Sequence, residues 1–115
     1  MELNEYQKRA MTTCMPSSEN FSYMFLNLVG EVGEFASKVA KAIRKEHADI
    51  SVNDLNLNEV VSDEELQKEA GDILWQLSGL CEVMGWSLEE VAQQNLDKLA
   101  SRKQRNVIDG SGDNR

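Results

Sequence analysis

An apolar side chain recurs at every third or fourth position from residue 21 to residue 42, which is the spacing of one face of an α-helix. A stripe sustained over about six turns predicts a long helix that buries this face against neighbouring helices. Strand-like runs are few, and the chain contains a single proline, Pro16. The pattern therefore predicts an all-α fold. The stripe consists of Phe21, Phe25, Leu28, Val32, Phe35, Val39 and Ala42.

Local start and stop signals place the first two predicted helices. A first helix is expected over residues 4–14, because Pro16 is incompatible with its continuation. Ser17 and Ser18 are the expected N-caps of the long helix. Basic side chains in its last turns, where the helix dipole favours them, indicate that it ends near Lys45.

Two Ser-x-x-Glu capping boxes, at residues 62–65 and 87–90, open the third and fourth predicted helices. Gly85 is expected to end the third helix. Apolar side chains recur at helical spacing on both and are expected to face inward. They are Leu66, Ala70, Ile73, Leu77, Leu80 and Met84 on the third helix, and Leu88, Val91, Ala92, Leu96 and Leu99 on the fourth.

We interpret residues 1–105 as one domain, a protomer of four-helix-bundle type. Residues 47–62, rich in Asn, Asp, Ser and Val, are expected to form an irregular loop or arm within it. Residues 106–115 lack a periodic pattern and are assigned as a C-terminal tail. Because so small a domain buries a modest share of its surface, we expect the protomer to be part of an oligomer.

The net charge of −8 argues against nucleic acid or an anionic membrane as a partner. No apolar run approaches the length of a membrane-spanning helix. Cys14 and Cys81 lack the spacing of metal ligands and are interpreted as core thiols. Together with an N-terminus that does not resemble a signal peptide, they favour a reducing cytoplasm.

A short phrase with an acid, a glycine and a second acid occurs on both long helices. Residues 31–34 read Glu-Val-Gly-Glu and residues 69–72 read Glu-Ala-Gly-Asp. The i,i+3 spacing places both acids of a phrase on one helix face, beside the apolar stripe. Antiparallel packing of the two helices would bring all four carboxylates around one point. They are Glu31, Glu34, Glu69 and Asp72.

Four converging carboxylates raise one another's pKa, and a hard divalent cation such as Mg²⁺ or Mn²⁺ relieves the repulsion. Gly33 and Gly71 each cost about 1 kcal/mol relative to alanine inside a helix. We expect them to allow close helix approach or to leave room for a ligand. The alternative is that each acid pair belongs to an ordinary solvated helix face, with Glu34 and Lys38 as a surface pair.

Residues 30–34 and 69–72 resemble the acidic signature of the MazG-like, all-α nucleoside triphosphate pyrophosphohydrolases. Residues 95–98, Asn-Leu-Asp-Lys, followed by Arg102, look like the Asn-x-x-Lys segment on the last helix of that family. The likeness covers nearly the whole chain. One departure is Gly30, at a position where the most common motif has a glutamate.

The resemblance implies a Mg²⁺-dependent enzyme that hydrolyses nucleoside or deoxynucleoside triphosphates to the monophosphate and pyrophosphate, in nucleotide-pool house-cleaning. It implies that the four acids form the catalytic metal site, with Mn²⁺ as a possible substitute. It also implies phosphate contacts from Asn95 and Lys98, to which Arg102, one turn further on, adds another. Members assemble as homodimers or as dimers of dimers, so the expected partners are the nucleotide and further copies of the chain.

Trp75 and Phe21 are candidates for contact with the base, although each also fits ordinary helix packing. Two other functions stay open at this point. Within the same superfamily, the chain is also compatible with a phosphoribosyl-ATP pyrophosphohydrolase or a dUTPase. A catalytically silent, nucleotide-binding helical oligomer is the alternative of a different class, and the carboxylate missing at Gly30 favours it.

Overall fold

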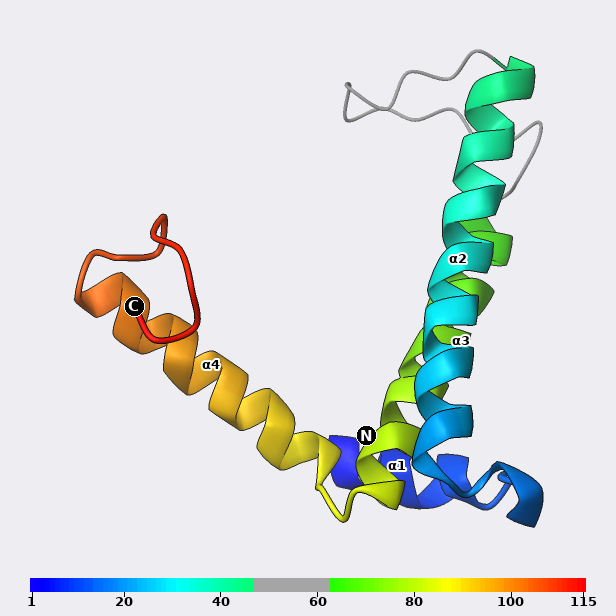
Figure 1. The fold of residues 1–115 in the computed structure, drawn as a ribbon, viewed down its shortest axis with the longest axis horizontal. Coiled ribbons are helices and arrows are strands. Elements are labelled where there is room, and N and C mark those ends of the chain that lie inside the picture. The colour runs from blue at the N-terminus through cyan, green and yellow to red at the C-terminus, as the bar shows by residue number, and fades with distance from the viewer. Residues whose placement is uncertain (47–62) are drawn as a thin grey trace.

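The computed structural model describes residues 1–46 and 63–115, and within these ranges it contains helices and no strand. The all-α fold is thereby confirmed. The loop predicted over residues 47–62 lies outside the described residues. The elements (Figure 1) are α1 (Leu3–Met11), the one-turn 3₁₀ helix η1 (Pro16–Ser18), α2 (Phe21–Glu46), α3 (Asp63–Val83) and α4 (Leu88–Gln104).

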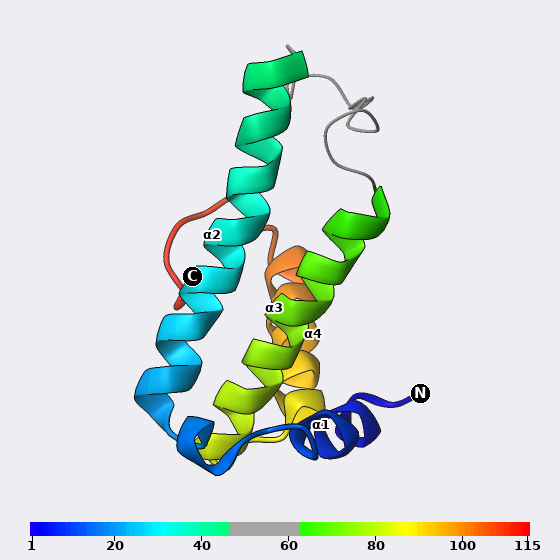
Figure 2. The same cartoon turned by 90° about the vertical axis from the view of Figure 1, so that its right-hand side faces the viewer.

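Helices α2 and α3 run antiparallel and side by side, and they form the main packing interface of the chain (Figures 1 and 2). Met24 of α2 is completely buried against Gly79 of α3. A β-carbon on Gly79 would lie 2.5 Å from Met24 Sδ, so only glycine lets the thioether pack there without displacement. Ala42 and Cys81 complete the small apolar core of this pair.

The start of α2 differs from the prediction. Ser17 and Ser18 belong to η1, and the capping side chain is Asn20, whose Oδ1 accepts a hydrogen bond of 2.8 Å from the backbone N–H of Tyr23. Both serines lie within the proline-initiated turn, so the cap is provided by Asn20, the residue directly before α2. The first helix is also shorter than expected, since α1 ends at Met11.

The boundary between α3 and α4 agrees with the prediction. Gly85 adopts a φ of 72°, and the N–H of Trp86 donates to the Cys81 carbonyl at 2.8 Å, which ends α3 in a glycine cap. Ser87 accepts a hydrogen bond from the Glu90 N–H at 3.2 Å and so caps α4.

Gln7 of α1 ties this boundary to the N-terminal helix. Its buried amide donates to the Trp86 carbonyl at 2.9 Å and to Glu82 at 3.0 Å. Its Oε1 accepts from the N–H of Leu88 at 2.8 Å, at the first residue of α4. These bonds satisfy buried backbone groups of the turn and thereby set the direction in which α4 leaves α3.

Beyond this turn, α4 extends away from the α2–α3 pair and packs mainly against α1 (Figure 1). The radius of gyration is 17.3 Å, whereas a compact chain of this length has about 13 Å. The open shape leaves much apolar surface uncovered. No helix among the described residues has both the length and the apolar character needed to cross a membrane.

The predicted apolar stripe of α2 is only partly buried, which corrects the expectation. Phe21, Phe25 and Val32 are exposed, whereas Met24 is buried against α3. Helix α2 is apolar on more than one face, so periodicity alone does not determine its rotation. On α4, only Leu88 of the expected inward positions is fully buried, and Val91, Leu96 and Leu99 are exposed.

Candidate metal site and phosphate-binding residues

Three of the four predicted acids meet between α2 and α3. One carboxylate oxygen from each of Glu31, Glu69 and Asp72 lies within 4.8 Å of the other two. We call these three residues the acidic cluster. The antiparallel packing of α2 and α3 brings the two sequence phrases to the same level. Glu34, the fourth acid, is exposed beside the cluster, and, after burial, its charge contributes to the raised pKa of Glu31.

The cluster contains buried polar atoms that no described residue satisfies. Glu31 Oε2 and Glu69 Oε2 are both buried and have no hydrogen-bond partner among the described residues. Burial, followed by the charges of Glu34, Asp72 and Glu69, raises the pKa of Glu31 above its ordinary value. Such an arrangement is unfavourable for the protein alone, because unpaired buried carboxylate oxygens lose their hydration without compensation.

Lys38 of α2 is a further member of the site. Its Nζ lies 2.8 Å from Glu69 Oε1, across the α2–α3 interface. The alternative interpretation of the acid pairs placed Lys38 in a surface pair with Glu34 on the same helix, and the structure instead pairs it with Glu69 of α3. Lys38 lies seven residues after Glu31, about two helical turns further on the same face, and that spacing was the available signal. Its ammonium offsets one negative charge of the cluster and leaves Glu69 Oε2 unpaired.

The glycines of the two phrases do not mark close helix contact. A β-carbon on Gly33 or Gly71 would meet no atom of the described residues within 4 Å, and one on Gly30 would lie 3.8 Å from Asn27 Oδ1. The expectation that these glycines allow close helix approach is therefore wrong. The second expectation was that they leave room for a ligand, and the space beside the carboxylates is open as this requires.

The donor set suits a hard divalent cation. Such a cation takes oxygen ligands, and the cluster offers carboxylate oxygens from three side chains, two of them with a buried oxygen that lacks a partner. Sulfur and imidazole ligands are absent from this group of described residues. The geometry therefore provides an acidic group able to hold a metal ion, without distinguishing among hard divalent cations.

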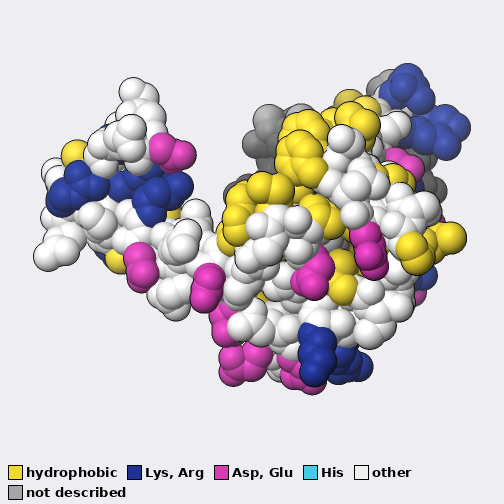
Figure 3. Space-filling model, turned by 60° about the horizontal axis from the view of Figure 1, so that its bottom comes forward, with side chains coloured by type: hydrophobic (Ala, Val, Ile, Leu, Met, Phe, Trp, Pro, Cys, Tyr) yellow, Lys and Arg dark blue, Asp and Glu magenta, His cyan; other side chains and the backbone are white. Residues whose placement is uncertain are grey.

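The residues predicted to contact phosphate lie elsewhere in the chain. Asn95, Lys98 and Arg102 are spaced along α4, and Lys98 and Arg102 both contact Asp113, at 3.2 and 3.1 Å. Figure 3 shows one group of Lys and Arg side chains at the far end of α4, next to an acidic side chain. This end points away from α2 and α3 (Figure 1), so one protomer does not bring these residues to its own acidic cluster.

The two candidates for base contact have different environments. The indole N–H of Trp75 donates to the Ala10 carbonyl at 3.1 Å and to Thr13 Oγ1 at 3.0 Å, which ties α3 to α1. Phe21 is 51% exposed and stacks on Phe25, with ring centroids 5.7 Å apart. Phe21 precedes Glu31 by ten residues, which is about 15 Å along the helix axis.

Tyr6 of α1 lies near the acidic cluster as well. Burial, followed by the charge of Asp72, raises the pKa of the Tyr6 hydroxyl. The phenol therefore stays protonated at neutral pH and is able to donate a hydrogen bond.

Comparison with known proteins agrees with this geometry. Residues 19–107 match the MazG nucleotide pyrophosphohydrolase domain, and this range contains α2, α3 and α4. The "Gene 37 protein" of Mycobacterium phage L5 is 38% identical over 122 aligned residues, which cover 100% of both chains. No solved structure is a significant match to this chain.

Proposed function

The chain belongs to the MazG nucleotide pyrophosphohydrolase family, and we propose that it is a Mg²⁺-dependent enzyme that hydrolyses nucleoside or deoxynucleoside triphosphates to the monophosphate and pyrophosphate. The observation that carries the proposal is the convergence of Glu31, Glu69 and Asp72 with two unsatisfied buried oxygens. We assign the enzyme to nucleotide-pool house-cleaning in the cytoplasm, in keeping with its free thiols at Cys14 and Cys81.

In this proposal the acidic cluster supplies the metal ligands, and Glu34 joins from the solvent side. When bound there, Mg²⁺, or Mn²⁺ in its place, would screen phosphate charge and would lower the pKa of a water molecule. Glu34 is exposed and adjacent to Glu31. It is therefore placed to accept the proton of the attacking water as general base. The open space at Gly33 and Gly71 receives the triphosphate chain.

The phosphate contacts come from a second copy of the chain in this proposal. Asn95, Lys98 and Arg102 do not reach the cluster of their own protomer, and the open shape leaves room for another. Apolar side chains are exposed on both surfaces that an assembly would cover. They are Phe21, Phe25, Leu26, Val29 and Val32 on α2, and Val91, Leu96 and Leu99 on α4. We infer a homodimer or a homotetramer built from dimers.

Pyrophosphate release over a panel of nucleotides tests the activity. The panel includes dUTP and phosphoribosyl-ATP, so that the products also separate the related activities. We expect turnover that requires Mg²⁺, and a loss in kcat/KM of at least about 100-fold in Glu69→Gln and Asp72→Asn. Glu64→Gln is the matched control, because Glu64 is an exposed acid on the same helix. The proposal fails if no nucleotide yields pyrophosphate in the presence of Mg²⁺.

Complementation between inactive variants tests the shared site. Asp72→Asn removes a metal ligand, and Lys98→Met removes a phosphate contact. If the two lie in one site contributed by different protomers, a mixed oligomer contains some sites with neither substitution. Mixing should therefore restore part of the activity, and light scattering should give a multiple of the 13.0 kDa protomer mass. A monomeric mass together with no restored activity would contradict this assembly.

A further inference from the structure

The segment that follows α4 folds back as a closed loop, which we call the C-terminal loop (residues 107–115). The guanidinium of Arg115 donates to the carbonyl oxygens of Gly112 at 2.6 Å, Val107 at 2.9 Å and Ile108 at 3.1 Å. Arg105 of the cap of α4 donates to the Arg115 carbonyl at 2.7 Å. These four bonds hold the loop to itself and to the end of the helix.

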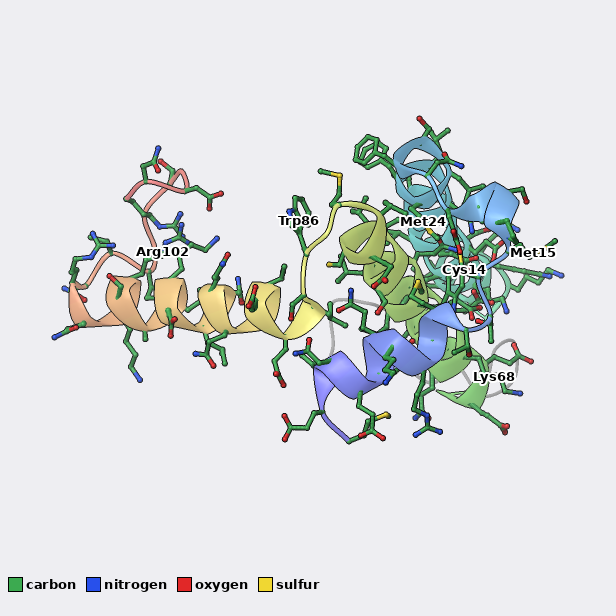
Figure 4. All side chains as sticks on the ribbon, turned by 90° about the horizontal axis from the view of Figure 1, so that it is seen from below. Cys14, Met15, Met24, Lys68, Trp86 and Arg102 are labelled. Atoms are coloured by element: carbon green, nitrogen blue, oxygen red, sulfur yellow. The ribbon has the colours of Figure 1, made fainter. Side chains whose placement is uncertain are left out.

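The loop places one carboxylate between two cations of α4. Asp113 Oδ1 accepts from Lys98 Nζ at 3.2 Å and from Arg102 Nη2 at 3.1 Å. The same Arg102 nitrogen also donates to the Asp113 backbone carbonyl at 3.1 Å. Figure 4 shows Arg102 near the end of α4, directed toward the returning loop. The hydrogen bonds from Arg102 and Lys98 lower the pKa of Asp113, so it is ionised at neutral pH.

The two cations keep donors that the loop does not use. The Lys98 ammonium has three donors and gives one to Asp113. Arg102 is only 5% exposed, and its Nε has no partner among the described residues. A buried guanidinium with an unpaired N–H is unfavourable unless a further acceptor binds, and phosphate oxygens match that geometry. Asp113 itself is at the surface, with 82% of its side chain exposed.

We propose that Asp113 is a positioning residue, which holds Lys98 and Arg102 in the arrangement that binds the polyphosphate chain of the substrate. The proposal rests on the proposed function and extends it to a residue outside the acidic signature. A free lysine side chain has many rotamers, and its tie to Asp113 places the ammonium beside the buried Arg102 before the ligand arrives.

The bonding of the C-terminal loop indicates that Asp113 positions Lys98 and Arg102 and does not compete with phosphate for them. A carboxylate that competed with phosphate would have to leave when the substrate binds. Asp113 is held through its backbone carbonyl as well as its side chain, and the four bonds of Arg115 and Arg105 close the loop independently of that carboxylate. The loop therefore keeps Asp113 in place while the remaining donors of Lys98 and Arg102 bind the anion.

The test compares Asp113→Asn with Asp109→Asn. Both substitutions remove one negative charge from the same exposed loop, and no ion pair of Asp109 is found in the part of the chain that the structure describes. The readouts are calorimetric titration with inorganic tripolyphosphate, and KM and kcat with the best nucleotide. Asp113→Asn should raise Kd and KM by about 3- to 10-fold, whereas Asp109→Asn should leave both within about 2-fold. Asp113→Glu should recover part of the loss.

Arg115→Ala is a second variant that leaves the carboxylate in the chain and opens the loop. It should weaken tripolyphosphate binding in the same direction, because Asp113 would no longer be held beside Lys98. Unchanged or tighter binding in Asp113→Asn overturns the proposal, and tighter binding would identify Asp113 as a competing anion. The pyrophosphate-release assay tests the proposed function separately. The tripolyphosphate titration still tests the role of Asp113 if no nucleotide is hydrolysed.

Discussion

Lys38 of α2 crosses the helix interface and binds Glu69 of α3, with Nζ 2.8 Å from Oε1. This ion pair brings a positive charge to the edge of the acidic cluster, beside a carboxylate whose other oxygen is buried and unpaired. The hydrogen bond to Glu69 raises the pKa of Lys38, and the charges of the neighbouring acids raise it further. Lys38 therefore remains charged across the neutral range. In the absence of a metal ion, Lys38 offsets part of the repulsion within the cluster.

We predict that Lys38→Met lowers the stability of the metal-free protein, because it removes the positive charge that offsets part of the repulsion within the acidic cluster. The same change should enlarge the stabilisation by Mg²⁺, because the cation no longer shares Glu69 with an ammonium. Thermal unfolding at a fixed protein concentration, with chelator and with Mg²⁺, measures both effects. Lys68→Met is the control, since its pair with Glu64 is highly exposed. Equal midpoints for the two variants in chelator would contradict the prediction.

The raised pKa of Glu31 predicts how stability depends on pH. Burial and the charges of Glu34, Asp72 and Glu69 hold the folded-state pKa above the unfolded value. The folded state therefore binds the proton more tightly, and stability from this group is present below the unfolded pKa and lost as pH rises through the folded pKa. Metal-free protein should become more stable as pH falls from neutrality toward the ordinary glutamate range, until other carboxylates titrate.

Glu31→Gln isolates this effect, because the amide has the shape of the protonated acid and does not titrate. Urea unfolding in chelator should show the variant to be more stable than the native chain at neutral pH, with a smaller difference in mild acid. Glu64→Gln should show no such dependence, as Glu64 is exposed. A native chain whose metal-free stability is flat between neutral and mildly acidic pH would refute the assignment.

The sequence predicted a helix boundary correctly where a single residue ends or caps the helix. Gly85 ends α3 and Ser87 caps α4 because each acts within its own turn. The rotation of α2 and the direction of α4 were not predictable in this way. Both depend on contacts between segments distant in sequence, such as Met24 on Gly79 and Gln7 on the backbone at Leu88.

The candidate site also combines features that local helical spacing predicts with features that depend on long-range contacts. The i,i+3 spacing predicted that each acid pair shares one helix face, and antiparallel packing was expected to bring all four acids together. The structure brings together three of them, Glu31, Glu69 and Asp72. The seven-residue spacing from Glu31 places Lys38 on the same face of α2, but its partner depends on which helix lies opposite, and periodicity does not determine that. Asp113 lies in an aperiodic segment, so the sequence offered no signal for its contact with Arg102.

The open space at Gly33 and Gly71 predicts opposite effects on stability and activity. The β-carbon of alanine at either position meets no atom within 4 Å in the part of the chain that the structure describes, and alanine removes the helical cost of glycine. Each substitution should stabilise the protein by up to about 1 kcal/mol. If the triphosphate occupies this space, KM should rise, because the added methyl group narrows it. Thermal unfolding and steady-state kinetics measure the two effects.

Gly79→Ala provides the contrast for this pair of variants. Its β-carbon would lie 2.5 Å from the buried sulfur of Met24, so the substitution should destabilise the protein by about 1 to 3 kcal/mol. Stabilised Gly33→Ala and Gly71→Ala proteins with unchanged KM would show that the substrate does not use the open space.

The indole of Trp75 allows a test of packing against base recognition. Trp75→Phe keeps an aromatic ring on α3 but removes the N–H that donates to the Ala10 carbonyl and to Thr13. Because these bonds tie α3 to α1, stability should fall by about 1 kcal/mol, while KM stays close to that of the native chain. Trp86→Phe is the control, since Trp86 is half exposed and its indole N–H makes no hydrogen bond to the described residues. A severalfold rise in KM with an unchanged unfolding midpoint would instead place Trp75 at the base.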